Sequence, residues 1–184
     1  MPTPIIVLIV IAVVILLYVM TTYNKLVGKR NKVANSWSQI DVQLKRRFDL
    51  IPNLLETVKG YAAHEKQTFE DVTQARTKYM SAGSHQDAID ADSELTKGLG
   101  KLFAVAEAYP DLKANTNFLE LQEELTNTED KISFARQFYN DVVMDYNNTV
   151  QMVPASIIAG MFKFTIEEFI HVDEAEAAVP KIKF

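Results

Sequence analysis

An uninterrupted apolar segment near the N-terminus constrains this fold more than any other feature. Residues 4–20 contain no charged side chain, and all nineteen Lys and Arg residues follow them. A helix from Ile5 through Thr22 would extend about 27 Å, roughly the thickness of the hydrocarbon core of a bilayer. A helix that is apolar on every side needs lipid or a large protein around it, and only about 160 residues remain. The segment therefore predicts a membrane-spanning anchor.

The flanks of this segment indicate that it is retained and predict its orientation. A cleaved signal peptide would carry a basic stretch before the apolar run and a small-residue cleavage site after it, and neither is present. The basic residues on the C-terminal flank are Lys25, Lys29, Arg30 and Lys32. Positive charge favours the cytoplasmic side, so we expect a single-pass cell-membrane protein with its N-terminus outside and its C-terminal bundle in the cytoplasm. The four basic residues are our candidates for contact with the lipid bilayer.

Charge is divided unevenly after the anchor. Residues 21–60 carry a net charge of +5, whereas residues 61–184 carry −10. An acidic body does not attract a phosphate backbone, which argues against nucleic acid as a partner. The basic stem could face an anionic leaflet or could pair with acidic helices of its own bundle. The absence of cysteine excludes disulfides, thiolate zinc sites and thiol catalysis.

Helical periodicity dominates the body and predicts an all-α fold, since valine-rich alternating stretches are missing. The first body helix has a heptad-like apolar seam, formed by Val33, Trp37, Ile40, Leu44, Phe48, Ile51, Leu55, Val58 and Ala62. Pro52 lacks an N–H, and its ring clashes with the carbonyl of Phe48. We therefore expect a kink or a restart between these two residues, with helix resuming to about Met80.

Three further helices are predicted, over about 87–108, 111–150 and 157–170. Residues 81–84 and 152–156 break the chain, and Pro110 is suited to the first position of a helix. Long helices with short connections fold as antiparallel neighbours. We thus expect a transmembrane helix that continues into an elongated antiparallel bundle of about four helices. The predicted domains are an anchor at 1–22, a helical bundle at 23–172 and an acidic C-terminal tail at 173–184.

Residue patterns typical of catalysis or metal binding are weak. His64-Glu65 lacks the second histidine, one turn later, that a zinc protease requires. Glu168-Phe-Ile-His171 has the spacing used in di-iron bundles, but it occurs once where such sites need a pair, so we interpret it as solvated residues at a helix end. A Gly-rich phosphate loop and a nucleophile elbow are also missing. We predict no catalytic, cofactor-binding or metal-binding residue and no cofactor.

Two polar groups are candidates for interaction. Lys45, Arg46 and Arg47 are adjacent, so they fan out around a helix and cannot all lie on the seam. They could bind anionic lipid or a neighbouring subunit, but we favour pairing inside the bundle with acidic residues among Glu120, Glu123, Glu124 and Glu129. The second group is a possible polar layer between helices, formed by Tyr139, Asn140, Tyr146 and Asn147. We interpret this layer as structural, with a ligand cage as the alternative.

Several longer segments carry a family resemblance. They include Tyr23-Asn-Lys-Leu-Val27, the stretch from Trp37 to Leu54, Val58-Lys-Gly-Tyr61, Ala106-Glu-Ala-Tyr-Pro-Asp-Leu-Lys-Ala-Asn115 and Tyr139-Asn-Asp141. In order and spacing these segments resemble the hallmark blocks of the LemA family, from the anchor to about residue 170. The resemblance implies a single-pass membrane protein with an antiparallel helical bundle. It implies little about activity, because the molecular function of that family is poorly defined.

The anchor, the long seam and the weak catalytic patterns favour a non-enzymatic, membrane-anchored scaffold or adaptor. Such a protein would present an acidic bundle to membrane or cytoplasmic proteins and could form a homo-oligomer. One alternative is a ligand-binding, metal-binding or enzymatic bundle with a polar pocket between helices. Another is an accessory subunit of a membrane protease or envelope-stress system.

Overall fold

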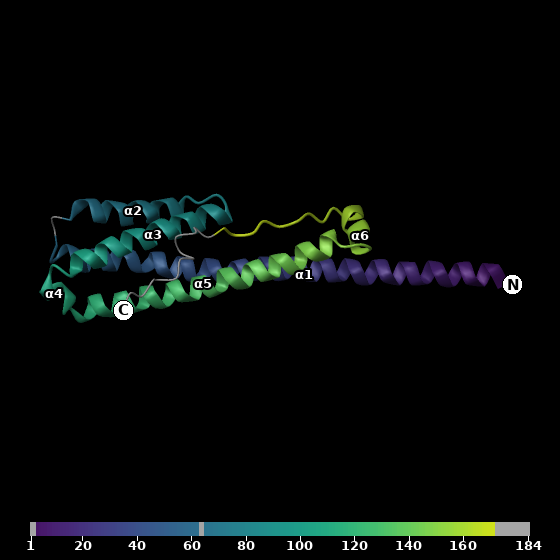
Figure 1. Ribbon diagram of the computed structural model, residues 1–184, viewed down its shortest axis with the longest axis horizontal. Coiled ribbons are helices and arrows are strands. Elements are labelled where there is room, and N and C mark those ends of the chain that lie inside the picture. The colour runs from purple at the N-terminus through teal and green to yellow at the C-terminus, as the bar shows by residue number, and fades with distance from the viewer. Residues whose placement is uncertain (1–2, 63–64, 172–184) are drawn as a thin grey trace, which may run out of the picture. The chain divides into compact units, whose positions relative to one another are not determined.

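The structure is a computed structural model that describes residues 3–62 and 65–171. Over these residues the regular secondary structure consists of helices alone, with no strand. This confirms the predicted all-α fold. The helices are α1 (Thr3–Lys59), α2 (Lys66–Met80), α3 (His85–Ala106), α4 (Pro110–Lys113), α5 (Thr116–Gln151) and α6 (Ala155–Met161) (Figure 1). The predicted tail at 173–184 and His64 lie outside the described residues.

The chain forms two compact units. Unit 1 comprises Met1–Ser38 and Gln137–Phe169, and unit 2 comprises Gln39–Arg136 and Ile170–Phe184. Helices α1 and α5 each supply one part to unit 1 and another part to unit 2. Each unit is therefore built around segments of the same two long helices.

In unit 1, the two long helices lie antiparallel. The ammonium group of Lys29 on α1 contacts the carboxylate of Asp145 on α5 at 2.6 Å. Eight residues later on α1, the ring of Trp37 packs edge-on against Tyr139, which precedes Asp145 on α5. Rising residue numbers on one helix thus pair with falling numbers on the other, as expected for antiparallel neighbours.

The end of α6 contradicts one prediction. A terminal helix over 157–170 is wrong, because α6 ends at Met161 and residues 164–171 are not helical. Lys163 adopts a left-handed φ of 57°, a conformation that ends α-helices. Phe164 is then buried, with its ring 5.8 Å from that of Tyr23. The chain therefore turns back along the unit in an extended conformation.

Unit 2 contains a bundle built from the C-terminal part of α1, from α2 and α3, and from the N-terminal part of α5. Helices α2 and α3 lie antiparallel, since Lys78 contacts Glu94 at 2.5 Å and Lys101 contacts Asp71 at 2.7 Å (Figure 1). The two helices approach closely at Gly98, where an added Cβ would lie 3.1 Å from Cγ2 of Val72. The glycine that weakens α3 as an isolated helix thus allows this close approach, and a Cβ there would press on the Val72 side chain.

Helix α1 runs through Pro52 without a break, so the restart that was one of the two expectations between Phe48 and Pro52 does not occur, and the kink stays a prediction. Phe48 and Ile51 are buried beside it while Pro52 itself is exposed, so seam packing holds the helix across the missing hydrogen bond. The interruption occurs later, between Lys59 and Lys66, where α2 begins as a separate helix. Most of the predicted seam is buried, although Trp37 and Leu55 are half-buried and Leu54 is fully buried instead.

The other helix boundaries follow local capping chemistry. The predicted break at 81–84 is confirmed, and the side chain of Ser84 caps α3 by accepting a hydrogen bond from the Asp87 amide at 3.1 Å. Pro110 opens α4, as predicted. The single helix expected over 111–150 is instead divided, because the side chain of Asn115 accepts from the Phe118 amide at 3.0 Å and starts α5.

Candidate functional site

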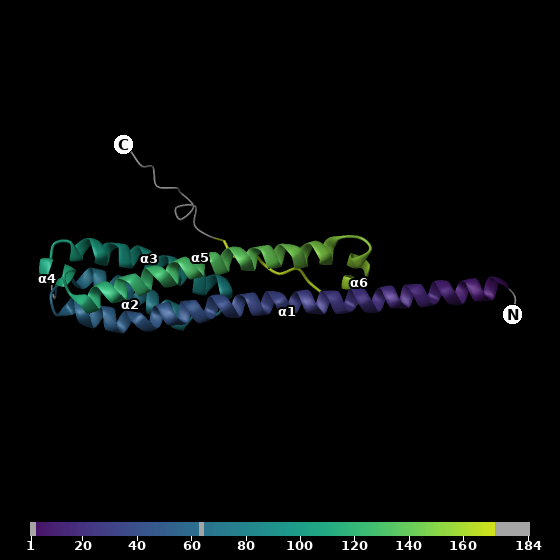
Figure 2. The same ribbon diagram turned by 90° about the horizontal axis from the view of Figure 1, so that it is seen from below.

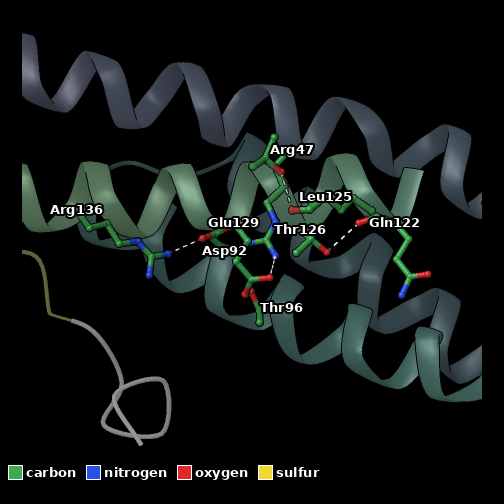
Figure 3. Close-up of polar contacts among 9 residues, drawn as sticks. Arg47, Asp92, Thr96, Gln122, Leu125, Thr126, Glu129 and Arg136 are labelled. Atoms are coloured by element: carbon green, nitrogen blue, oxygen red, sulfur yellow. Dashed lines mark hydrogen bonds and ion pairs between the residues drawn. The ribbon is translucent and has the colours of Figure 1, made fainter. Parts of the chain in front are cut away.

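A cluster of four charged side chains, three buried and one half-exposed, lies inside unit 2 and joins three of its helices. Asp92 on α3 is 1% exposed and lies between two guanidinium groups. Arg47 on α1 donates from Nη1 to Oδ1 of Asp92 at 2.6 Å, and Arg136 on α5 donates to the other carboxylate oxygen (Figure 3). Nη2 of Arg47 also lies 3.3 Å from Oε2 of Glu129, which accepts a hydrogen bond from Thr96. We call Arg47, Asp92, Glu129 and Arg136 the ionic cluster.

The charges of the ionic cluster balance one another. Two guanidinium groups face two carboxylates, so their formal charges sum to zero. Isolated charges are very costly to bury, whereas pairs that are also hydrogen-bonded can be retained. The cluster therefore links α1, α3 and α5 through paired charges, although Nε of Arg47 is buried without a hydrogen-bond partner. Such an arrangement is suited to specifying how helices pack.

The three adjacent basic residues of α1 have different environments. Lys45 is exposed. Arg46 contacts Glu124 at 2.5 Å on the surface of unit 2, and Arg47 is 1% exposed within the ionic cluster. Arg46 and Arg47 thus pair with acidic residues inside the unit. The sequence interpretation included Glu124 and Glu129 among these partners but missed Asp92.

Arg136 was not among the predicted interaction residues, although the sequence contains a signal for it. Arg136 lies between the buried residues Ile132 and Tyr139 on the apolar face of α5, and Asp92 follows the buried Ile89 on α3. Charged residues at seam positions are rarely buried unless they are paired. Opposite charges at seam positions of separate helices would therefore have indicated a buried ion pair.

Tyr79 on α2 forms a second polar contact within unit 2. Its ring stacks on Phe48 with centroids 4.2 Å apart, and its hydroxyl donates to the carboxylate of Asp41 at 3.4 Å. Burial raises the pKa of Tyr79 to about 12, and the nearby carboxylates of Asp41 and Asp49 add to this shift. The phenol is thus held neutral, as a hydrogen-bond donor.

In unit 1, three of the residues expected to form a polar layer between helices bond through their polar groups to the extended chain after α6. The hydroxyl of Tyr146 donates to the carbonyl of Thr165 at 2.8 Å. Asn147 donates to the carbonyl of Glu167 at 2.8 Å and accepts from its amide at 2.9 Å. The Tyr139 hydroxyl donates to the Glu168 carbonyl at 3.3 Å. These side chains of α5 thus provide hydrogen-bond partners for the backbone of residues 165–168, which has no neighbouring strand to pair with.

The remaining member of the expected layer, Asn140, is half-buried on α5. Burial raises the pKa values of Tyr139 and Tyr146, and the carboxylate of Glu167 acts in the same direction on both. Both hydroxyls therefore remain donors to the extended segment. Because residues 164–171 are not helical, Glu168 and His171 also lack the helical spacing of a metal motif.

The four flank residues of the anchor differ in how far they are engaged. Lys25 is exposed. Lys29 bonds to Asp145 and to the Thr149 hydroxyl at 2.8 Å, so its charge is directed into unit 1. The guanidinium of Arg30 lies 5.2 Å from the ring centre of Phe164, and the ammonium of Lys32 lies 5.9 Å from that of Phe138. Lys25, Arg30 and Lys32 are thus exposed, and Lys29 is the flank residue held in an ion pair.

No group of three or more His, Asp or Glu side chains is arranged to hold a metal ion within residues 3–62 and 65–171. A solvent-open hollow of about 730 Å³ lies beside α2, lined by Lys59, Lys66, Phe69, Glu70, Thr73, Gln74 and Thr77. Phe69 is its one buried lining residue. The hollow is separate from the ionic cluster.

These features define an all-α protein with one helix, among the described residues, that is long and apolar enough to cross a membrane. The model of the LemA family matches residues 36–184. The chain belongs to the LemA family.

The chain is also similar to individual proteins, at 23–27% identity. Protein LemA of Metamycoplasma hominis is 27% identical over 128 residues, which cover 69% of this chain and 58% of that protein. Magnetosome protein MamQ 2 of Paramagnetospirillum magneticum is 24% identical over 173 residues, covering 80% of this chain and 64% of that protein. Magnetosome protein MamQ of Magnetospirillum gryphiswaldense is 23% identical over 175 residues, with coverage of 81% and 64%. The chain thus spans less than two thirds of the length of these relatives.

Proposed function

We propose that this protein is a membrane-tethered, non-enzymatic helical scaffold that presents an acidic bundle to protein partners. The observation that carries this proposal is the exposure of the apolar part of α1. Its large side chains from Ile5 to Met20 are about half exposed or more, apart from Tyr18 at 41% and Val19, and 6% of the apolar stretch is buried. Such a surface is costly in water and favourable in lipid.

The tether joins a body whose buried charges are internally paired, which supports a structural role for the ionic cluster. By contrast, the outward face of α5 in unit 2 carries charges that are exposed and acidic. Glu120, Glu123 and Asp130 are exposed along it, and we call these three residues the acidic face. Leu119 is 47% exposed and Phe134 is 72% exposed on the same helix segment. Exposed carboxylates with an aromatic anchor suit a basic protein partner.

The proposal includes an orientation and a domain organisation. The N-terminus lies outside, residues 1–22 form the anchor, and residues 23–172 form a cytoplasmic body. The basic residues on the C-terminal flank of the anchor support this orientation. The names of the magnetosome relatives are compatible with a role at a cellular structure rather than with a particular reaction.

The test is crosslinking in intact cells, followed by purification in detergent and mass spectrometry. The full-length protein should recover a reproducible protein partner or a homo-oligomer. The Glu120→Lys/Glu123→Lys variant should lose that partner, because it reverses the charge of the acidic face. The matched control is Asp49→Lys/Glu56→Lys, which makes the same charge change at exposed positions of α1 and should retain the partner.

Two outcomes would contradict the scaffold proposal. A monomer that purifies with a metal or small molecule would favour the ligand-binding alternative. Equal loss of the partner in both variants would show that the acidic face has no particular role. Recovery of a membrane protease would instead favour the alternative of an accessory protease subunit.

A further inference from the structure

Exposed apolar side chains gather where α5 turns into α6. Five large residues there are between 47% and 80% exposed: Met152, Val153, Ile157, Met161 and Phe162. We call them the corner patch. The chain from Tyr146 to Phe162 contains no charged residue over seventeen positions. An apolar surface of this kind at the end of a helical unit is typical of a contact with lipid or protein.

Helix α6 is apolar on both of its sides. Ile158 and Ala159 are buried at 4% and 1% exposure, so one side packs within unit 1. Ile157 and Met161 are four residues apart and are 62% and 69% exposed, so they share the outward side. Packing of α6 within the unit accounts for the first pair of residues. It does not account for an outward side that is equally apolar.

The location of α6 within unit 1 indicates what covers this side. The ring of Phe162 lies 4.8 Å from the ring of Tyr23, and Thr22 and Leu26 beside it are buried. Figure 2 shows α6 against α1 at the point where the apolar part of α1 leaves the packed part of the unit. Tyr23 follows directly after the segment that is long enough to span the hydrocarbon core. At about 1.5 Å per residue, α6 therefore lies within about one helical turn of the membrane edge.

We propose that the corner patch inserts into the interfacial region of the bilayer that the anchor spans, as a second membrane contact of unit 1. Interfacial lipid accepts aliphatic and aromatic side chains at this depth, and the exposed rings of Tyr18 and Tyr23 lie at the same end of the anchor. This inference rests only on the membrane anchoring in the proposed function. It does not depend on the scaffold role or on the identity of a partner.

Charge near the patch is complementary to anionic headgroups. Lys163 directly follows the patch and is exposed. Lys25 is also exposed and lies three residues after Thr22, about 4.5 Å along the helix. This distance is shorter than the Debye length of about 8 Å at physiological salt, so its attraction to anionic lipid is not screened away. Lys29 contributes less, because it pairs with Asp145.

The absence of cysteine allows the contact to be measured with single labels in the full-length protein. Three variants, Met161→Cys, Val13→Cys and Met80→Cys, are labelled with an environment-sensitive fluorophore. They are reconstituted into vesicles of phosphatidylcholine and phosphatidylglycerol, with and without nitroxide-labelled lipid. Met80 is the matched control, since it is also a methionine at 69% exposure but lies at the end of α2. Val13 reports insertion of the anchor.

We expect a blue-shifted emission and several-fold stronger quenching by nitroxide lipid at position 161 than at position 80. Position 13 should be quenched by nitroxides placed deep in the acyl chain, and position 161 by nitroxides near the headgroup. Adding Ile157→Glu to Met161→Cys should reduce the blue shift at position 161. Adding Ile166→Glu, at another exposed apolar position of unit 1, should leave it unchanged.

Quenching at position 13 without quenching at position 161 would overturn the second contact and leave the anchor intact. A blue shift at 161 that does not respond to nitroxide lipid would also overturn it, since a second copy or another protein would then cover the patch. Absence of quenching at both positions would overturn the second contact and the membrane anchoring together.

Discussion

At the residue scale, the chain uses charge to determine how apolar helices pack. Asp92 and Arg47 are each 1% exposed, and Arg136 is 6% exposed. Hydrophobic seams alone specify helix pairs only loosely, because many registers bury similar area. A carboxylate that must meet two guanidinium groups favours one register of α1, α3 and α5. We interpret the ionic cluster as the feature that selects this packing.

Asp92→Asn should lower the free energy of unfolding by about 3–5 kcal/mol, because two buried guanidinium groups lose the carboxylate between them. The measurement is urea unfolding of the full-length protein in detergent, followed by circular dichroism. Asp90→Asn is the control, since Asp90 is exposed on the same helix and should change stability by less than about 0.5 kcal/mol. Equal stability of the two variants would contradict a role for the cluster in packing.

Ionisation of Tyr79 should lower the free energy of unfolding at alkaline pH. Its pKa is raised to about 12 in the folded protein, from an ordinary value of 10.0. The folded state therefore holds the phenol proton more tightly, so this contribution is fully present below pH 10 and is lost as the pH rises toward 12. Unfolding measured across this range should show a weaker decline for Tyr79→Phe than for the natural protein. Identical declines would show that the Tyr79 hydroxyl is not perturbed.

At the element scale, tertiary contacts decide where helices end. Residues 164–171 follow a short helix and contain apolar residues that would suit a further turn, yet they are not helical. Side chains of Tyr146 and Asn147 on α5 bond to the backbone of Thr165 and Glu167. These bonds replace the backbone hydrogen bonds that a helix would make within itself. The segment can therefore stay extended while Phe164 and Ile170 are buried.

Asn147→Ala should release this extended segment. The substitution removes two hydrogen bonds to Glu167 and should cost about 2 kcal/mol of local stability. Hydrogen exchange followed by mass spectrometry should show faster exchange of the amides of residues 165–170, with little change in α2 and α3. Asn148→Ala provides the comparison, because Asn148 is its exposed neighbour on α5. Similar exchange in both variants would mean that other contacts hold the segment.

At the scale of the whole molecule, a single long helix supplies the exposed apolar segment, further residues of unit 1 and a part of unit 2. Its apolar part is exposed, and its later part carries the buried seam. The same element thus changes environment along its length. Membrane location and bundle formation are consequently properties of one continuous segment, and the proposed scaffold depends on both.

The proposed orientation predicts which side of the membrane the body faces. A cysteine introduced at exposed Met80 should resist a membrane-impermeant maleimide in intact cells and react after the membrane is permeabilised. This follows from the basic flank, which favours the cytoplasmic side. A cysteine at Thr3 should show the opposite behaviour. Labelling of position 80 in intact cells would reverse the proposed topology.

Much of the fold could be predicted from the sequence because periodicity and capping are local. The apolar segment, the helical seams, the break at 81–84 and the helix start at Pro110 each depend on residues within a few turns. The continuity of α1 through Pro52 could not be predicted in this way. Its local cost is offset by buried neighbours in the same helix, and their burial depends on segments distant in sequence.

The sequence by itself determined the all-α class, the anchor and the family, since these follow from composition, period and ordered motifs. Only the tertiary structure decided that Asp92 joins Arg47 to Arg136, and that Asn147 holds an extended segment rather than a helix. Only the structure brings the corner patch beside Tyr23. The ionic contacts of Asp92 and the contact of Tyr23 with Phe162 each join residues more than forty positions apart. The bonds of Asn147 to Glu167 override a local helical preference across twenty positions. A charge at a seam position indicates burial, but no local pattern identifies its partner, and this is the physical reason that all three contacts share.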